Sequence, residues 1–212
     1  EIRNPLTNIN LSLEQLKDEV QNEIEDADLY FTIIERNTER IGTLISDLLN
    51  SSKPKELLLK EQSIEHVLNE AVEMVEDRLN LLKIQKEIQF EDNLPKVLLD
   101  SEQFKIAILN LLINAIEAMK PEKGILKLKA FSGNEEILIF IEDNGKGISK
   151  ESISSLFEPF FSQKKEGSGL GLTTVQNIIH SHQGKIDVDS EIGEGTKFTL
   201  SIPKYSREKS TV

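Results

Sequence analysis

The chain has 212 residues, with 25 Lys and Arg against 37 Asp and Glu, so its formal net charge is −12. This acidic balance argues against general nucleic-acid binding, which needs a positive surface to displace counterions from phosphates. The absence of Cys excludes disulfides and thiolate metal sites. No apolar run approaches the ~20 residues that span a bilayer. We expect a cytoplasmic segment of a longer protein, whose membrane anchor, if it has one, lies outside this sequence.

Apolar residues recur at alternating spacings of three and four through residues 1–52, in two runs separated by an acidic segment. Such narrow stripes are typical of coiled coils and four-helix bundles. We predict a helical hairpin over residues 1–55, with residues 5–50 pairing with a second copy into a four-helix bundle. The alternative is that the rest of the chain folds back over the hairpin. The stripes comprise Leu6, Ile9, Leu13, Leu16 and Val20, then Tyr30, Ile34, Asn37, Ile41, Leu44 and Leu48.

Strand and helix patterns alternate over residues 56–205, and a polar tail follows at 206–212. Both hairpins and crossovers are expected, which predicts an α/β sandwich with a mixed sheet and an α+β class for the whole chain. The irregular segment 144–169 is long enough to be functional. We expect helices over 64–79, 104–119 and 170–181, and strands over 57–59, 88–90, 125–131, 137–141, 185–188 and 196–202.

Two groups of polar residues interrupt this apolar pattern. Asn110 and Asn114 lie four residues apart, so they share one face of the expected helix, where amide oxygens could hold a cation or contact phosphates. Asp143 follows an apolar strand, where its carboxylate could accept a hydrogen bond from an exocyclic amine such as that of adenine. The residues alone leave simpler readings open, namely two amides bonded to core neighbours and an Asp-Asn-Gly turn.

Two further motifs lie within the segment 144–169 and across its C-terminal end. Residues 157–161 place three of the nine Phe in five positions, either to clamp a ligand or to anchor the loop on the domain. The run Gly167-Ser168-Gly169-Leu170-Gly171-Leu172 leads into a helix, whose first N–H groups attract phosphate. The run is not a P-loop, because no Gly-Lys-Ser/Thr follows it. It is not a dinucleotide-binding fingerprint, because no strand leads directly into it.

In this order the motifs resemble those of the ATP-binding domain of sensor histidine kinases, one of the Bergerat-fold ATPases. The N box corresponds to Asn110 and Asn114, and the first G box to Asp143, Gly145 and Gly147. The F box and second G box correspond to Phe157, Phe160 and Phe161 and to Gly167, Gly169 and Gly171. Residues 193–196, Gly-Glu-Gly-Thr, resemble the last motif of that domain.

The opening residues, Glu-Ile-Arg-Asn-Pro-Leu, resemble the phosphoacceptor box His-Glu-x-x-Asn-Pro-Leu of the same family. The acceptor His of that box would stand immediately before Glu1, and the sequence given starts after it. The resemblance implies that Glu1 assists the imidazole as general base or orienting partner. It also implies that Asn4 takes part in dephosphorylating a response regulator.

The resemblance further implies a homodimer that binds ATP and Mg²⁺ and transfers the γ-phosphoryl group to that His and then to a response-regulator receiver domain. Adenine would bind Asp143 and the metal would bind Asn114. The alternatives are a catalytically silent dimeric module and another Bergerat-fold ATPase, such as an anti-sigma kinase that acts on Ser. The ATP-binding residues so implied are Asn110, Asn114, Asp143, Gly145, Gly147, Ile148, Phe160, Lys164, Ser168, Gly169, Leu170, Gly171, Leu172 and Thr196.

Overall fold

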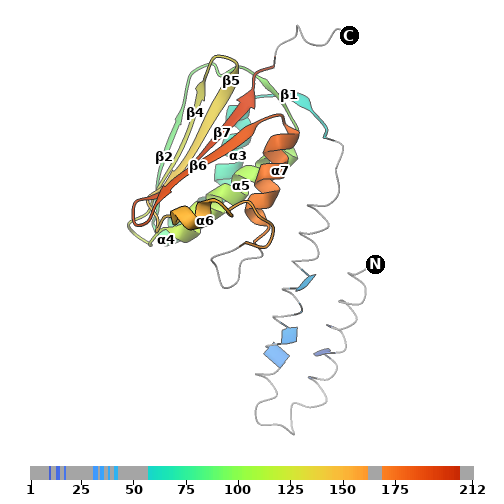
Figure 1. Cartoon of the computed structure of the whole chain (residues 1–212), viewed down its shortest axis with the longest axis vertical. Helices are drawn as coiled ribbons and strands as arrows, with labels where there is room; N and C mark the ends of the chain where they lie inside the picture. Colours follow the sequence, from blue (N-terminus) through green and yellow to red (C-terminus); the bar gives the residue numbers. More distant parts are fainter. Residues whose placement is uncertain are drawn as a thin grey trace. The chain divides into compact units, whose positions relative to one another are not determined.

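The computed structural model divides the chain into two compact units, Glu1–Pro54 and Lys55–Val212 (Figure 1). Residues 57–161 and 169–205 are described throughout, together with scattered positions between residues 10 and 42. The expected limits at residues 55 and 205 stay predictions. The scattered positions are Asn10, Leu13, Glu14, Lys17, Phe31, Thr32, Ile34, Glu35, Thr38, Ile41 and Gly42.

Every described position of the first unit is helical, as the predicted helical hairpin requires. Phe31 and Thr38, seven residues apart, are buried within the single chain. Ile34 and Ile41, also seven apart, are 43% and 48% exposed. A seven-residue spacing keeps each pair on one side of its helix. Phe31 and Thr38 are therefore covered within the chain, while Ile34 and Ile41 of the predicted stripe face outward. The expected Asn37 of the stripe lies outside the described residues.

The second unit is built on a five-stranded sheet of order β2-β4-β5-β7-β6 (Figure 1). β2 pairs with β4 in parallel, and the other three pairings are antiparallel, so the prediction of a mixed sheet is confirmed. A separate two-stranded sheet pairs β1 with β3. The strands are β1 (Lys60–Gln62), β2 (Gln85–Phe90), β3 (Val97–Leu99), β4 (Ile125–Ser132), β5 (Glu136–Asp143), β6 (Lys185–Glu191) and β7 (Gly195–Pro203). The helices are α3 (Ile64–Glu73), α4 (Glu76–Leu82), α5 (Ser101–Ala118), α6 (Lys150–Ile153) and α7 (Gly171–Ser181).

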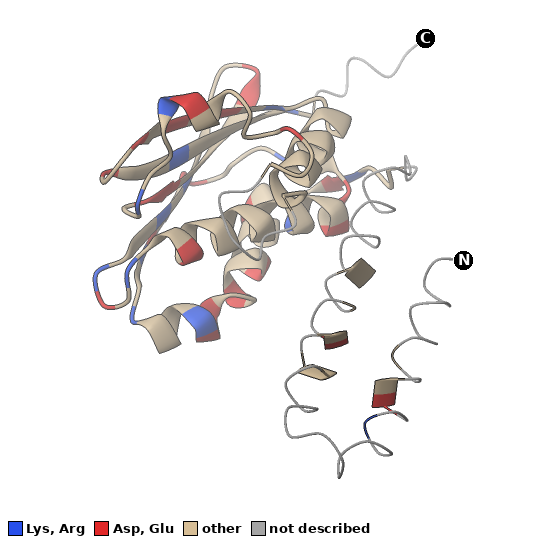
Figure 2. Cartoon of the chain, turned by 60° about the horizontal axis from the view of Figure 1, so that its bottom comes forward, with Lys and Arg blue, Asp and Glu red and all other residues tan. Residues whose placement is uncertain are grey.

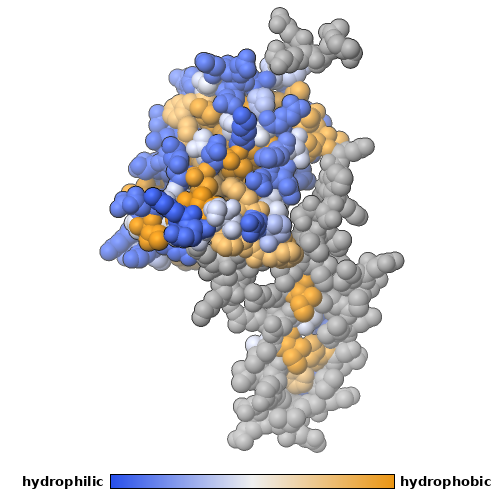
Figure 3. All heavy atoms as spheres, viewed as in Figure 1, coloured by the Kyte–Doolittle hydropathy of each residue, from blue (hydrophilic) through white to orange (hydrophobic). Residues whose placement is uncertain are grey.

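The core of this unit lies between the sheet and a layer of helices (Figure 2). Burial alternates residue by residue along β4 and β5, because one face of the sheet meets the helices and the other faces outward. Leu128 and Ile139 of the sheet and Phe104 and Leu111 of α5 are at most 1% exposed. Removing this apolar surface from water holds the two layers together. On the outside, apolar residues are interspersed among hydrophilic ones (Figure 3).

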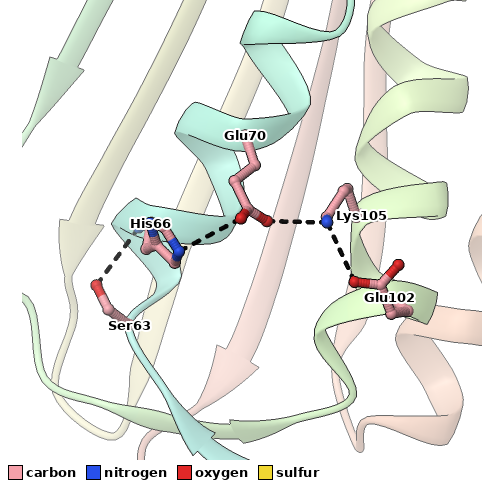
Figure 4. A network of polar contacts seen from close by, with 5 residues as sticks. All are labelled: Ser63, His66, Glu70, Glu102 and Lys105. Atoms are coloured by element: carbon pink, nitrogen blue, oxygen red, sulfur yellow. Dashed lines mark hydrogen bonds and ion pairs between the residues drawn. The ribbon is translucent and has the colours of Figure 1, made fainter.

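An ionic network on the surface joins α3 to the first turns of α5 (Figure 4). Lys105 Nζ lies 2.9 Å from Glu70 Oε2 and 3.2 Å from Glu102 Oε1, and His66 Nε2 lies 3.3 Å from Glu70 Oε1. Ser63 caps α3 by accepting a hydrogen bond from the His66 amide. The hydrogen bond from Lys105 lowers the pKa of Glu70. Because solvent reaches Glu70, His66 and Glu102, whose side chains are 38%, 71% and 78% exposed, the network contributes little stability, but it links α3 to α5.

Two expectations for the start of this unit were wrong. Residues 57–59 form no strand, because the amide of Leu58 bonds to Asp100 Oδ2 at 3.1 Å and its side chain is 70% exposed. The strand β1 follows at Lys60–Gln62, where its partner β3 is available. The apolar stripe over 64–79 is two helices rather than one, because the chain turns at Met74–Val75. The turn keeps Val75 and Leu79 in the core.

Candidate functional site

Helix α5 brings its two asparagines to the beginning of α7. Asn110 and Asn114 are half-buried on one face of the helix, as their spacing predicts. The Asn110 amide group donates to the carbonyl of Ile106 at 2.9 Å, within the same helix. A Cβ placed on Gly171 would lie 3.0 Å from Asn110 Oδ1, so α7 begins against this face. No side chain caps α7 at Leu170. The first N–H groups of the helix therefore have no side-chain acceptor at the cap position.

Asp143 ends β5 as a half-buried carboxylate. Its Oδ1 accepts a hydrogen bond from the amide of Gly145 at 2.8 Å. Burial raises the pKa of Asp143 to about 6, and backbone hydrogen bonds from Gly145 and Thr196 oppose that rise. Thr196 lies opposite Asp143 in the β5–β7 register and is buried. The result is a carboxylate that is ionised at pH 7 and held in place by backbone groups.

Two glycines let the neighbouring loops pack against Asp143 and the end of β6. Gly195 has φ +119°, and a Cβ there would lie 1.9 Å from the carbonyl oxygen of Asp143. Gly147 has φ +68°, and a Cβ there would lie 2.0 Å from the carbonyl oxygen of Glu191. Both positions combine a backbone conformation that favours glycine with no room for a side chain. The glycines therefore serve backbone packing, which sequence reasoning had not assigned to them.

Ser190 is a site residue that sequence reasoning missed. Its Oγ accepts from the amide of Ile148 at 2.8 Å and donates to the carbonyl of Gly195 at 2.7 Å. It also lies 3.0 Å from Thr196 Oγ1. Ser190 thus joins the loop after β5 to the β6–β7 turn. A single Ser near the end of an alternating strand carries no sequence signal for this contact, which depends on the strand register.

The Asp143 group and the Asn110–Gly171 contact lie along the same helix. The loop after β5 meets the end of α5 where the amide of Lys146 donates to the carbonyl of Ala118 at 3.1 Å. Ala118 follows Asn110 by eight residues, which is about 12 Å along a helix axis. Asn114 lies midway between them. A carboxylate therefore stands at one end of this two-turn stretch and a helix N-terminus at the other.

The aromatic loop is anchored by one Phe and leaves another outside. Phe157 packs against the core, and its carbonyl accepts a hydrogen bond from Thr173 Oγ1 at 3.1 Å. Phe160 is 58% exposed, and its amide donates to the carbonyl of Gly169 at 3.1 Å. That bond draws the two ends of the segment between residues 160 and 169 together. Phe157 thus anchors the loop on the domain, whereas the exposed side chain of Phe160 does not.

The structure brings the described candidates into two groups. Asp143, Gly145, Gly147, Ile148 and Thr196 gather at the end of β5, and Asn110, Gly169, Leu170 and Gly171 gather at the start of α7. Leu172 packs partly against the core. Four candidates, namely Glu1, Asn4, Lys164 and Ser168, lie outside the described residues.

Two families match the chain. Residues 99–206 match the family described as histidine kinase-, DNA gyrase B- and HSP90-like ATPase. Residues 1–57 match the His Kinase A (phospho-acceptor) domain. The chain belongs to the sensor histidine kinase family. The resemblance read from the sequence motifs is thereby confirmed.

Named histidine kinases are similar to this chain over most of its length. Sporulation kinase E of Bacillus subtilis (strain 168) is 33% identical over 205 residues, which cover 96% of this chain and 27% of that protein. Sensor histidine kinase ZraS of Escherichia coli (strain K12) is 32% identical over 203 residues, which cover 96% of this chain and 43% of that protein. The chain thus spans less than half the length of either relative.

Solved histidine kinase structures share the fold. The catalytic domain of ThkA is 27% identical, with a TM-score of 0.64, over 69% of this chain and 95% of that chain. Full-length ShkA in complex with AMPPNP is 24% identical, with a TM-score of 0.76, over 97% of this chain and 44% of that chain. ThkA in complex with the response regulator TrrA is 24% identical, with a TM-score of 0.70, over 98% of this chain and 61% of that chain.

Among the residues that the structure describes, no helix combines the length and apolar character needed to cross a bilayer.

Proposed function

We propose that this chain is the kinase core of a two-component sensor. It binds ATP with Mg²⁺ and transfers the γ-phosphoryl group to the histidine that precedes Glu1 in the family motif. The phosphoryl group then passes to an aspartate of a response-regulator receiver domain. The observation that carries the proposal is the alignment of Asp143 and the Asn110–Gly171 contact along two turns of α5. The AMPPNP complex of the structural relative ShkA supports it.

Asp143 recognises the adenine. Its carboxylate is charged at pH 7, since burial raises its pKa only to about 6. A half-buried, ionised carboxylate is a strong acceptor for the exocyclic amine of the base. The bond from Gly145 to Oδ1 fixes the orientation of the group. The backbone hydrogen bonds from Gly145 and Thr196 therefore hold the carboxylate in a defined orientation.

The N-terminus of α7 faces the phosphates. Its first N–H groups, which have no side-chain acceptor at the cap position, and the positive end of the helix dipole favour negative charge beside Gly171. Ser168 and Lys164 precede this helix in the chain and add a hydroxyl and a positive charge. The amide oxygen of Asn114 suits Mg²⁺, a hard cation that takes oxygen ligands from few side chains, from phosphates and from water. When bound, the metal neutralises phosphate charge during transfer.

The transfer itself needs residues of both units. The imidazole nitrogen attacks the γ-phosphorus in line, a nitrogen–phosphorus bond forms, and the bond to the β,γ-bridging oxygen breaks to release ADP. Glu1 accepts the imidazole proton. Asn110 cannot take a proton from water, so simple ATP hydrolysis stays slow. Asn4 orients a water for dephosphorylation of the response regulator. Because ATP is the phosphoryl donor, we propose a cytoplasmic location for this part of the protein.

The first unit forms the dimer and presents the phosphorylated residue. Ile34 and Ile41 are about half exposed on one side of the helix, and a second copy would cover them in a four-helix bundle. The same bundle offers its surface to the receiver domain. The complex of the structural relative ThkA with the response regulator TrrA supports this partner class.

The test is phosphotransfer in a longer chain that includes the histidine before Glu1. With γ-labelled ATP and Mg²⁺ we expect acid-labile label on the protein, and no label when that histidine is replaced by Gln. A folded protein that binds ATP but never takes up label would instead be a silent nucleotide-binding module. Rapid ATP turnover without a phosphoprotein would indicate another ATPase of the same fold.

A further inference from the structure

A buried histidine outside the proposed site has both ring nitrogens bonded. His182, the residue after α7, is 4% exposed. Its Nε2 lies 2.9 Å from the amide nitrogen of Asp100, and its Nδ1 lies 2.7 Å from the carbonyl oxygen of Ile178. A backbone N–H can only donate, so Nε2 is the acceptor. A carbonyl can only accept, so Nδ1 carries the proton and the ring is neutral.

These bonds join the end of α7 to the beginning of α5. Asp100 is the N-cap of α5, and its Oδ1 accepts from the amide of Gln103 at 3.1 Å. The ring of Phe104, in the first turn of α5, meets the His182 ring edge to face, with centroids 5.8 Å apart. The contact with Phe104 therefore helps to hold the His182 ring in the position where it bonds Asp100. We call the pair of Asp100 and His182 the α5–α7 joint.

The α5–α7 joint lies at the far end of the two helices from the proposed nucleotide site. Asn110 follows Asp100 by ten residues and Gly171 precedes His182 by eleven, so the spans are about 15 Å and about 16 Å. The helices are thus antiparallel and touch at both ends of α7: its C-terminal end meets the start of α5 at the joint, and its N-terminal end meets the middle of α5 at Asn110. A slide of α7 by one residue, about 1.5 Å, would separate Nε2 from the Asp100 amide.

We propose that His182 is a positioning residue for the nucleotide site. By bonding Asp100 it sets the register of α7 on α5, and so holds the first N–H groups of α7 beside Asn110, where the phosphates bind. It acts through the helix and touches no substrate. This inference rests on the proposed function, because the consequence it names is the placement of groups that bind ATP.

The decisive variant is His182→Asn in the whole chain. The shorter amide keeps a donor near Nδ1 for Ile178 but leaves the Asp100 amide without its acceptor. We expect calorimetry to give about fivefold weaker binding of Mg-AMPPNP, in line with one lost buried hydrogen bond. His182→Gln, whose longer side chain can reach Asp100, should restore binding to within about twofold. The exposed His180 supplies the matched control, and His180→Asn should bind as wild type.

A second control separates positioning from general destabilisation. Ile64→Ala removes a fully buried side chain from α3 and should lower the melting temperature without moving the α5–α7 joint. If His182→Asn binds the nucleotide no worse than Ile64→Ala, His182 has no positioning role. A wild-type chain that fails to bind would instead overturn the proposed function. Amide exchange then still decides the inference: exchange in residues 174–178, whose amides bond within α7 beginning with Thr174 to Leu170, should be faster in His182→Asn than in Ile64→Ala, and equal rates would refute it.

Discussion

Gly171 lies directly against Asn110: a Cβ at the first position of α7 would come within 3.0 Å of Asn110 Oδ1. That separation is shorter than an ordinary van der Waals contact. The asparagine is not free to yield without loss, because its amide group is bonded to the carbonyl of Ile106. The beginning of α7 therefore packs tightly against the face of α5 that carries Asn110.

Replacing Gly171 by Ala should separate stability from binding. Gly171 is the first residue of α7, where Ala gains less over Gly than the ~1 kcal/mol of a helix interior. Displacement of Asn110 offsets that gain, so we expect a melting temperature close to that of the wild type. Because the new methyl group displaces Asn110, we expect ATP affinity to fall about fivefold or more. Gly193→Ala is the reciprocal control. Its φ of +87° makes Ala costly by roughly 1 kcal/mol, yet nothing lies within 4 Å of the added Cβ, so affinity should hold. Wild-type affinity in Gly171→Ala would contradict the proposed role of the contact.

Asp143→Asn tests the adenine contact. The amide removes the ionised acceptor and offers the base a donor, so we expect adenine nucleotide affinity to fall about tenfold or more. The matched control is Glu142→Gln, because Glu142 is the preceding residue of β5 and its side chain lies on the opposite face of the sheet. Calorimetry with both folded variants measures the difference. Equal affinities for the two variants would rule out Asp143 as the adenine acceptor.

Nucleotide affinity should depend on pH through the same group. Burial raises the pKa of Asp143 to about 6, so protonation of the free protein competes with adenine binding as the pH drops below 6. We expect affinity to reach a plateau above pH 7 and to decline toward pH 5. In Asp143→Asn this dependence should be absent. A wild-type affinity that stays constant from pH 7 to pH 5 would be inconsistent with an ionised acceptor.

Folding stability should change with pH in the opposite sense. The folded-state pKa of Asp143 lies above its ordinary value of 3.8, so the folded protein binds more protons than the unfolded one between those two values. This group's contribution to stability is then lost as the pH rises through that window. Urea unfolding should show Asp143→Asn gaining stability relative to wild type between pH 4 and pH 7. If the difference in unfolding free energy between Asp143→Asn and the wild type were the same at pH 4 and pH 7, burial would not raise the pKa of Asp143.

The dimer should depend on the exposed side of the second hairpin helix. Ile34→Lys or Ile41→Lys places a charge in the expected bundle core, so light scattering should report a shift from dimer to monomer. Glu14→Lys is the control, since Glu14 is exposed on the first helix. A dimer that survives both isoleucine changes would place the interface elsewhere.

Local periodicity predicts much of this fold, and its failures have physical causes. The alternation along β4 and β5 and the Asn spacing on α5 are visible in the sequence, because one face of each element is buried. Strands β1 and β3 have three residues each, and each forms only because the other is present, so no local signal marks them. The break between α3 and α4 is hidden because its apolar residues keep a helical spacing.

The site divides in the same way. Asp143 and its glycines follow from a motif, since their chemistry lies within a few residues of chain. Ser190 and His182 could not be predicted, because each acts on backbone groups distant in sequence: Ser190 bonds the amide of Ile148, and His182 bonds the amide of Asp100. Such contacts depend on strand register and helix packing, which no single segment encodes.

The proposed function requires that the face of α5 between Asn110 and Ala118 bind an adenine nucleotide with Mg²⁺. The direct measurement is titration of the whole chain with Mg-AMPPNP, followed by calorimetry and by amide NMR shifts. We expect binding heat, with the largest shifts at Asn110, Asn114, Asp143 and Gly171. Absence of heat together with unshifted amides at these four positions, in a protein whose spectrum shows it to be folded, would contradict it.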